Sequence, residues 1–187
     1  MNNKEVCIDD EIRYNLPPNW SIARLNSISR IESGGTPSRT NSSYWDGDIH
    51  WIKISDINNK YVNDSEEKIT EKGLNNSSAK LFKKGTLLYT IFATIGTVGI
   101  LNIDATTNQA IAGINFYGDL DINYMYYVAL NMKHMALDQA RGMAQLNINQ
   151  TILKNLIIPI PPMNEQIKIA NQIEFLFKII DSFFTNQ

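Results

Sequence analysis

The stretch IPIPPMNEQIKIANQI, from Ile158 to Ile173, separates two kinds of structure and so decides much of the fold. Its β-branched start is the end of a predicted strand at 152–160, and Pro161-Pro162 stops that strand because proline lacks the amide donor that a sheet needs. After the prolines we predict a helix to about Phe184, with Asn164 as its N-cap. Five apolar residues alternate spacings of four and three along this helix, which is the pattern of a coiled-coil seam: Ile169, Ile173, Leu176, Ile180 and Phe183.

The predicted helix carries more apolar surface than one packing face needs. Further apolar residues widen the seam or add to the helix surface: Ala170, Phe175, Phe177, Ile179 and Phe184. Two arrangements remain open. The helix either folds back on its own domain or packs against a partner helix, from another chain or from a missing half of the protein. Its position as the last element, after a proline hinge, favours the partner helix.

The residues before the prolines predict a domain of short helices and strands. Apolar residues spaced by three between Ser21 and Ile31 indicate either one short helix or a strand followed by a helical turn. A longer helix is predicted from Ile122 to Ala140, capped by Asp119 or Asp121 and ended by Gly142. The buried stripe expected along it consists of Ile122, Met125, Ala129, Met132 and Ala136.

Three strands are predicted before that helix, at residues 50–56, 87–92 and 110–117. The second is apolar on both faces and is therefore expected in the interior. Turns and loops are expected between these elements, at 34–37 and 46–48, in a surface loop with one helical turn at 58–78, and at the glycines of 95–101, which mark a bend, a bulge or a close backbone approach. The fold class expected is α/β (α+β), with a mixed, mostly antiparallel sheet and short helices followed by a coiled-coil-type helix.

The bulk composition limits the function. The chain has 187 residues, a net charge of −2 and a pI of about 5.7, which argues against a protein that grips nucleic acid alone through a large basic face. Reading DNA within a larger complex stays open. The single cysteine, Cys7, excludes an internal disulfide framework and suits a reducing cytosol. No apolar run approaches the roughly 20 residues of a membrane span, and the polar start indicates a disordered leader at 1–15 rather than a signal peptide, so we expect a cytoplasmic protein.

Motifs that carry catalysis are missing from the sequence. His50 and His134 are the only histidines, and with one cysteine they cannot complete a zinc site at the usual spacings. There is no phosphate loop, dinucleotide-binding glycine motif or nucleophile elbow. A lone nuclease would need acidic metal ligands that the sequence does not assemble. We therefore expect no catalytic residues and no metal in this chain.

Groups suited to recognition occur in two segments. The first runs from Ser33 to Ile52, where a guanidinium, amides and hydroxyls follow paired glycines; its candidate DNA-binding residues are Gly34, Gly35, Thr36, Ser38, Arg39, Asn41 and Tyr44. The second follows the predicted helix 122–140 and contributes Arg141, Gln145 and Asn147. Arginine can bind a guanine edge, asparagine an adenine edge, and hydroxyls or backbone amides can hold phosphates.

The plainer interpretation of both segments stays open. The first can be a polar surface loop pinned by Tyr44 and Trp45, and the second an ordinary connection between a helix and a strand. The lysines Lys80, Lys83 and Lys84 could contact phosphates, although solvated charge is the default interpretation.

Taken in order, eight blocks of the chain resemble one half of a type I restriction–modification specificity subunit. They are LPPNW with a leucine five residues after the tryptophan, GGTPS, YWDGDIHWIKISDI, ITEKGLNNSSAKLFKKGTLL, FATIGTVGIL, TNQAI, QLN and IPIPPMNEQIKIANQI. The resemblance covers roughly Leu16 to Asp181. Each block alone is weak, but eight in register are specific.

The resemblance implies a non-catalytic DNA target recognition domain at 16–160 that reads one half of a split double-stranded DNA sequence. It also implies a conserved spacer helix at 161–187 that docks methyltransferase (M) subunits in a complex with restriction (R) subunits. S-adenosylmethionine is then expected on the partner methyltransferase subunit, with no cofactor on this chain. Residues 34–38 match the family's Gly-Gly-Thr-Pro-Ser block and 145–147 a segment near the DNA-facing side. The start of the conserved helix is matched by Pro161, Pro162, Glu165 and Gln166.

The chain departs from the family pattern, because members usually carry two recognition domains and two long helices. It is expected to be a natural half-subunit, a truncated allele or a cloned fragment. Half-subunits could form a homodimer through the helix, which would restore two half-sites and predict a palindromic split target. The alternative is a truncated relic that pairs with other subunits through its helix and reads no DNA.

Overall fold

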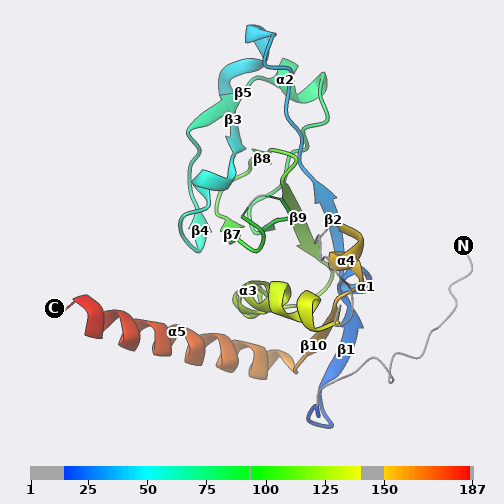
Figure 1. Cartoon of the computed structure of the whole chain (residues 1–187), viewed down its shortest axis with the longest axis vertical. Helices are drawn as coiled ribbons and strands as arrows, with labels where there is room; N and C mark the ends of the chain where they lie inside the picture. Colours follow the sequence, from blue (N-terminus) through cyan, green and yellow to red (C-terminus); the bar gives the residue numbers. More distant parts are fainter. Residues whose placement is uncertain (1–14, 93, 140–149, 186–187) are drawn as a thin grey trace, which may run out of the picture.

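The computed structural model describes residues 15–92, 94–139 and 150–185 (Figure 1). Residues 1–14 of the expected leader lie outside this range. The same holds for Arg141, Gln145 and Asn147, and for Gly142 as the predicted helix stop.

A five-stranded sheet forms the centre of the body, in the order β2-β9-β6-β7-β4. Its strands are antiparallel except for the parallel pair of β4 and β7. They are β2 (Ser29–Ser33), β4 (Tyr61–Val62), β6 (Leu87–Thr90), β7 (Val98–Leu101) and β9 (Ile111–Phe116). All four residues of β6 are buried, which confirms the interior strand predicted from its unbroken apolar run.

Hydrophobic residues cover both faces of this sheet. On one face, Leu87 and Tyr89 pack in the same cluster as Met125 of helix α3 (Ile122–Gln139). On the other face, Leu88 packs in a second cluster with Ile52 and neighbours. Alternate residues of one strand therefore enter two separate cores.

Helix α3 begins where the sequence predicts. The Asp121 side chain accepts a hydrogen bond from the Tyr124 amide at 2.7 Å, so Asp121 is the cap and Asp119 is not. Met125, Ala129 and Met132 are fully buried along the predicted stripe, while Ile122 is only partly buried.

A smaller, three-stranded sheet stands at the end of the body opposite the C-terminal helix (Figure 1). It consists of β3 (Trp45–Ile52), β5 (Glu67–Ile69) and β8 (Thr106–Thr107), accompanied by two 3-10 turns, η2 (Ser42–Tyr44) and η3 (Ile54–Asp56), and by the short helix α2 (Glu71–Asn75). This sheet corrects two predictions. The turn expected at 46–48 lies inside β3 as an irregularity between Trp45 and Ile49, with Asp46 at φ 60°, and the strand expected at 50–56 ends at Ile52.

The chain ends of the body pair in a two-stranded ribbon of β1 (Ser21–Arg24) and β10 (Ile157–Ile160). Between β1 and β2 lies one helical turn, α1 (Leu25–Ile28), so the strand-and-turn alternative for residues 21–31 is the correct one. The strand predicted at 152–160 is wrong in its first half, where helix α4 (Gln150–Asn155) precedes β10. The loop predicted at 58–78 contains the expected helical turn, α2, but also β4 and β5.

Helix α5 (Met163–Thr185) follows the two prolines and extends away from the body (Figure 1). It begins one residue before the predicted cap, so Asn164 lies within its first turn and is not the N-cap. Instead, the carbonyl of Pro162 accepts the amides of Glu165 and Gln166. The mixed α+β fold with a C-terminal helix confirms the fold class predicted from the sequence.

Candidate nucleic-acid interface

Gly34 and Gly35 join the loop that follows β2 to strands β9 and β8 through backbone hydrogen bonds. The Gly34 amide donates to the Ile111 carbonyl at 3.1 Å and the Gly35 amide to the Thr107 carbonyl at 2.8 Å. A Cβ atom would lie 2.0 Å from Thr107 Oγ1 at Gly34, and 2.4 Å from the Ser78 backbone at Gly35. Both glycines are buried, so they hold this glycine-hinged loop (residues 34–44) in place and expose no surface for a base.

Thr36 and Gln109 form a polar pair beside the hinge. The Thr36 hydroxyl donates to the Gln109 amide oxygen at 2.5 Å. Gln109 is exposed and lies in the loop before β9, 73 residues along the chain. The contact holds the Gln109 side chain beside the hinge, and a glutamine amide carries both a donor and an acceptor that can bind base edges.

A second polar contact joins the hinge to the end of the other candidate segment. The Gln150 side chain donates to Ser33 Oγ at 2.7 Å, directly before Gly34. Gln150 opens α4 and directly follows residues 140–149, which hold Arg141, Gln145 and Asn147. The residue before the glycine-hinged loop and the last residue of the second candidate segment are therefore in contact, although they lie far apart in the sequence.

Arg39 lies across an aromatic pair. Its guanidinium carbon is 3.7 Å from the Trp45 ring centroid and 4.8 Å from that of Trp51, and the two rings meet edge to face at 5.1 Å. Arg39 also forms an ion pair with Glu67. This hydrogen bond from Arg39 lowers the pKa of Glu67 below its ordinary value, with a further contribution from Lys53. The Arg39 side chain keeps 53% of its exposure, so the guanidinium is preoriented while one side faces solvent.

The remaining candidates of the loop make local contacts. Asn41 Oδ1 accepts from the Ser43 amide at 3.1 Å and caps η2. Ser38 is exposed, its hydroxyl bonds that of Thr40 at 2.9 Å, and its carbonyl accepts from Trp45 Nε1. The Tyr44 carbonyl accepts the Thr70 amide at 3.0 Å.

The structure thus brings Thr36, Ser38 and Arg39 together on exposed loop surface, and uses Gly34, Gly35 and Asn41 to shape that surface. Sequence reasoning missed Gln109, whereas Gln150 is the last residue of the second candidate segment, 141–150, but was not among its predicted binding residues. A signal for Gln109 was present, because it stands in the TNQAI block with a polar side chain directly before a strand of apolar residues.

Two of the three candidate lysines pair with acids. Lys80 contacts Glu32 and Lys83 contacts Asp104, each at 2.7 Å, and both lysine side chains are about half exposed or more. The hydrogen bond from Lys83 lowers the pKa of Asp104. The Lys84 amide donates to the same carboxylate at 2.9 Å. The solvated-charge interpretation fits Lys80 and Lys83.

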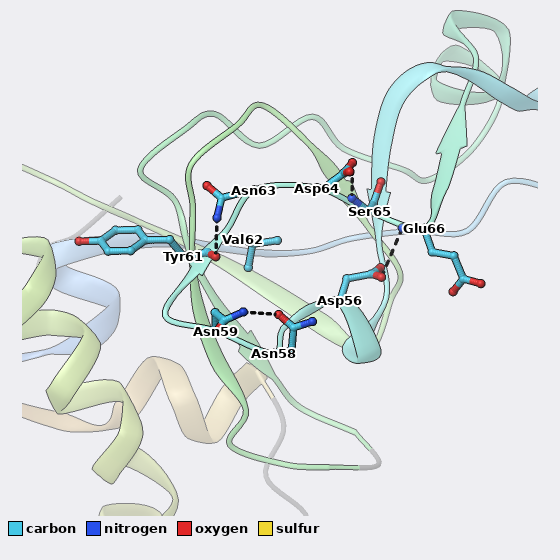
Figure 2. Close-up of a pocket in the computed structure, with 9 residues that line it drawn as sticks. All are labelled: Asp56, Asn58, Asn59, Tyr61, Val62, Asn63, Asp64, Ser65 and Glu66. Carbon is cyan, nitrogen blue, oxygen red and sulfur yellow. Dashed lines mark hydrogen bonds between the residues drawn. The ribbon is translucent and has the colours of Figure 1, made fainter. Parts of the chain in front are cut away.

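A pocket of about 370 Å³ is lined by residues of the segment 56–66, which runs from the end of η3 through β4 to the start of β5 (Figure 2). Asp56, Asp64 and Glu66 line it, so its charge opposes a DNA phosphate. Its polar groups bond mainly to each other or to the backbone: Asn59 Nδ2 donates to Asn58 Oδ1 at 2.8 Å, and Asp56 accepts the Lys53 and Glu66 amides. The pocket serves loop structure.

The first turn of α5 is fastened to the body through the residues that match the family's conserved helix start. Glu165 accepts hydrogen bonds from Asn19 Nδ2 and Trp20 Nε1, both at 2.7 Å. Gln166 is 2% exposed; its amide oxygen accepts the Asp121 amide and its nitrogen donates to the Pro161 carbonyl, both at 2.9 Å. Glu165 and Gln166 therefore join the helix to its own domain rather than presenting a free contact surface.

The predicted seam of α5 divides into two parts. Ile169 and Ile173 are partly buried and line an apolar cavity of about 340 Å³ with Tyr124 and Met135 of α3. Leu176, Ile180 and Phe183 are 57%, 48% and 71% exposed. The first half of the helix packs on its own domain, which is the first of the two arrangements left open by the sequence. The partner helix stays a prediction for the exposed residues of the second half.

Within the described residues, no group of three or more histidine, cysteine, aspartate or glutamate side chains is arranged to hold a metal ion. In the same part of the chain, no helix has the length and apolar character to cross a membrane.

Comparison with known proteins gives one consistent match. The family model described as type I restriction modification DNA specificity domain matches residues 17–183. The chain is 33% identical over 172 residues to the type I restriction enzyme MjaIX specificity subunit of Methanocaldococcus jannaschii, covering 89% of this chain and 40% of that protein. It is 27% identical over 168 residues to the EcoR124I/EcoR124II specificity subunit of Escherichia coli, covering 86% and 40%.

Two solved structures share the fold at 19% identity. The HsdS subunit from Thermoanaerobacter tengcongensis superimposes with a TM-score of 0.72 over 94% of this chain and 41% of that one. A chain from a structural study of complex assembly and conformational transition of the type I R-M system gives a TM-score of 0.70 over 91% and 41%. The present chain spans about two fifths of the length of these relatives.

Proposed function

The chain belongs to the family of type I restriction modification DNA specificity domains, and on that premise we propose that it reads one half of a bipartite double-stranded DNA target. One observation carries the proposal, namely the convergence of oriented hydrogen-bonding groups at the glycine hinge. The Thr36 hydroxyl donates to the Gln109 amide oxygen, and Ser33 Oγ accepts from Gln150 at the end of the second candidate segment. Groups held in place by hydrogen bonds suit base readout, since base edges are distinguished by the placement of donors and acceptors.

Each group has a role in this proposal. The Gln109 amide presents a donor and an acceptor, the pair that binds an adenine edge. Arg39 can bind guanine bidentately or a phosphate, once it exchanges its contact with Glu67 for the DNA. Ser38 would contact a backbone phosphate through its exposed hydroxyl. The contributions of Arg141, Gln145 and Asn147 to the same interface remain part of the proposal.

We further propose two functional parts, a recognition domain at 16–160 and a spacer helix at 161–187. The helix would dock methyltransferase subunits through the exposed part of its seam, which carries Leu176, Ile180 and Phe183. A second copy of the chain is the other proposed partner, and a symmetric pair would read a palindromic split target. Ile169 and Ile173 would contribute to either interface at its inner end.

In this proposal the reactions belong to the partner subunits. The methyltransferase subunit would bind S-adenosylmethionine, the restriction subunit would cut, and this chain would select the sequence. The division explains why a chain with a net charge of −2 can serve DNA recognition, because affinity for the phosphate backbone can be shared across the assembly.

The test is sequence selection from a randomised duplex library by the chain assembled with its methyltransferase subunits. Sequencing of the bound duplexes is expected to give one short enriched half-site. The Thr36→Val, Gln109→Leu double variant should lose the preference at one position by about 5-fold to 150-fold, since one base contact contributes about 1–3 kcal/mol. Arg39→Ala combined with Arg141→Ala should weaken selection further.

Lys83→Ala is the matched control, because Lys83 is an exposed ion-paired residue outside the hinge. It should leave the enriched sequence unchanged. Assembly without any enrichment in the wild type would reject DNA readout and favour the relic, a protein-interaction module.

A further inference from the structure

Lys60 lies at the meeting point of three elements of the molecule. It directly precedes β4, and its ammonium is 5.5 Å from the ring centroid of Tyr61, 5.4 Å from that of Tyr126 and 5.1 Å from that of Tyr127. The two latter tyrosines belong to α3. The same ammonium forms an ion pair with Glu174 of α5, 114 residues along the chain. One cation therefore contacts β4, α3 and α5.

These contacts are sheltered from solvent. The Lys60 side chain is 19% exposed and that of Glu174 34%, and partial burial makes both the ion pair and the cation–π contacts stronger than at an open surface. Tyr127 additionally stacks on Phe177, with ring centroids 6.3 Å apart and an interplanar angle of 18°. Tyr61 donates its hydroxyl to Asn123 Oδ1 at 2.9 Å, which ties β4 to the start of α3.

The position of Glu174 along α5 lets this cluster restrain the direction of the helix. The first turn is fixed by Glu165 and Gln166. Ile169 and Ala170 add apolar packing on the body just beyond it, a contact with less defined geometry than an ion pair. Glu174 lies eight residues beyond Gln166, which is about 12 Å at 1.5 Å per residue. Two attachments separated by that length fix a direction, and beyond them Ile180 and Phe183 are exposed.

We propose that Lys60 is a positioning residue that sets the direction of α5 relative to the DNA-reading body. This inference rests on the proposed function, in which α5 separates two half-sites, so the direction of α5 fixes the distance and rotation at which a second half-site is read. A need to hold α5 in one direction would explain why a lysine, rather than an apolar residue, lies among the three tyrosine rings. An apolar contact can slide, whereas an ion pair with ring contacts has a narrow geometric optimum.

The experiment measures the direction of α5 without DNA. Spin labels are attached at Lys72→Cys in α2 and at Phe184→Cys near the end of α5, in a Cys7→Ser background, and the distance distribution is recorded by double electron–electron resonance. Lys60→Met should broaden this distribution and shift its mean. Lys60→Arg, which keeps a cation able to stack on the rings, should stay close to the wild type.

Two further variants make the result decisive. Lys83→Met removes the separate ion pair with Asp104 and should leave the distribution unchanged. Glu174→Gln keeps Lys60 among its rings but removes the α5 partner, so it should reproduce the broadening even if Lys60→Met fails to fold. A folded Lys60→Met or Glu174→Gln protein whose distribution superimposes on the wild type would overturn the proposal.

The distance measurement also separates this inference from the proposed function. If the variants broaden the distribution as expected while the wild type selects no DNA sequence, Lys60 positions α5 and the readout proposal fails. If DNA selection is found and the distribution is insensitive to both variants, the readout stands and the positioning role is rejected.

Discussion

Gly34 shows how the absence of one side chain lets the glycine-hinged loop pack against the sheet. The space for its missing side chain is filled by Thr107 Oγ1 at 2.0 Å and by backbone carbonyl oxygens at 2.3 and 2.6 Å. Backbone oxygens cannot rotate away as a flexible side chain can. The constraint at Gly34 is therefore steric, and the loop follows the sheet edge because only a hydrogen atom fits between them.

Gly34→Ala is expected to reduce the free energy of unfolding by about 2–3 kcal/mol, as overpacking against backbone does. Gly118→Ala is the control, since nothing lies within 4 Å of its Cβ position and its φ of 66° alone opposes alanine, at about 1 kcal/mol. Urea denaturation followed by circular dichroism measures both. Equal losses in the two variants would show that the close packing of Gly34 has no energetic consequence.

Glu174 makes stability depend on pH at the α5 attachment. The hydrogen bond from Lys60 lowers the pKa of Glu174 below the ordinary value of 4.5, and Lys178 and Tyr127 also face it. Because the folded pKa is the lower one, the stabilisation is present above the unfolded value and is lost as the pH falls through the folded pKa. The folded protein should therefore lose stability below about pH 4.5.

Urea denaturation at several pH values around this range tests the assignment. The Glu174→Gln variant should lose less stability than the wild type as the pH falls, and the two curves should converge in acid. Parallel curves for the two proteins would contradict it. Other lowered carboxyls, Glu32, Glu67 and Asp104, are common to both proteins and cancel in the comparison.

At the scale of elements, α5 depends on a buried amide at its first turn. Gln166 satisfies the Asp121 amide and the Pro161 carbonyl, so its removal leaves one partly buried and one buried polar group without this partner. Gln166→Ala should lower the unfolding free energy by about 2–3 kcal/mol. Gln172→Ala, at an exposed position of the same helix, should stay within about 0.5 kcal/mol of the wild type, and thermal unfolding compares them. Similar stabilities would show that Gln166 is no anchor.

The exposed half of α5 is expected to control assembly without affecting the body. Leu176→Glu with Phe183→Glu places charge on the apolar seam and should abolish association with methyltransferase subunits or with a second copy, since burying those charges is unfavourable. Asn171→Glu is the control at an exposed polar position. Sedimentation velocity measures the assembly, and unchanged association of the double variant would exclude this seam as the interface.

Elements with a strong repeating pattern could be predicted from the sequence, and elements held by distant contacts could not. Helix α5, strand β6 and strand β9 carry their signal in their own periodicity or apolar run. Strand β4 has two residues and exists because Tyr61 and Val62 pair with β7, 39 residues away. In the run TILKNLIIPI, apolar content alone could not separate α4 from β10, since short apolar segments fit either state.

The candidate site was predictable in the same partial way. The glycines and Arg39 stand out by residue type, but their roles depend on contacts across the fold. Glu67, which pairs with Arg39, is 28 residues away, and Gln109, which pairs with Thr36, is 73 residues away. Sequence spacing gives no information about such partners.

In the whole molecule, the proposed DNA-binding loop and the proposed subunit-docking helix lie at different ends. The three-stranded sheet and the tip of the glycine-hinged loop lie at the end opposite α5, and the five-stranded sheet with its two cores lies between them (Figure 1). In the account proposed here, the direction of α5 relative to the body sets where a second half-site is read, and partner subunits supply both the reactions and much of the phosphate affinity.

The measurement that tests this account most directly is the ratio of dissociation constants for two duplexes of equal length, one carrying the selected half-site and one scrambled. It is made by fluorescence anisotropy on the chain assembled with its methyltransferase subunits, at one fixed salt concentration, because phosphate contacts would otherwise mask sequence discrimination. The account predicts tighter binding of the selected duplex by about 10³-fold or more. Equal dissociation constants for the two duplexes would contradict it.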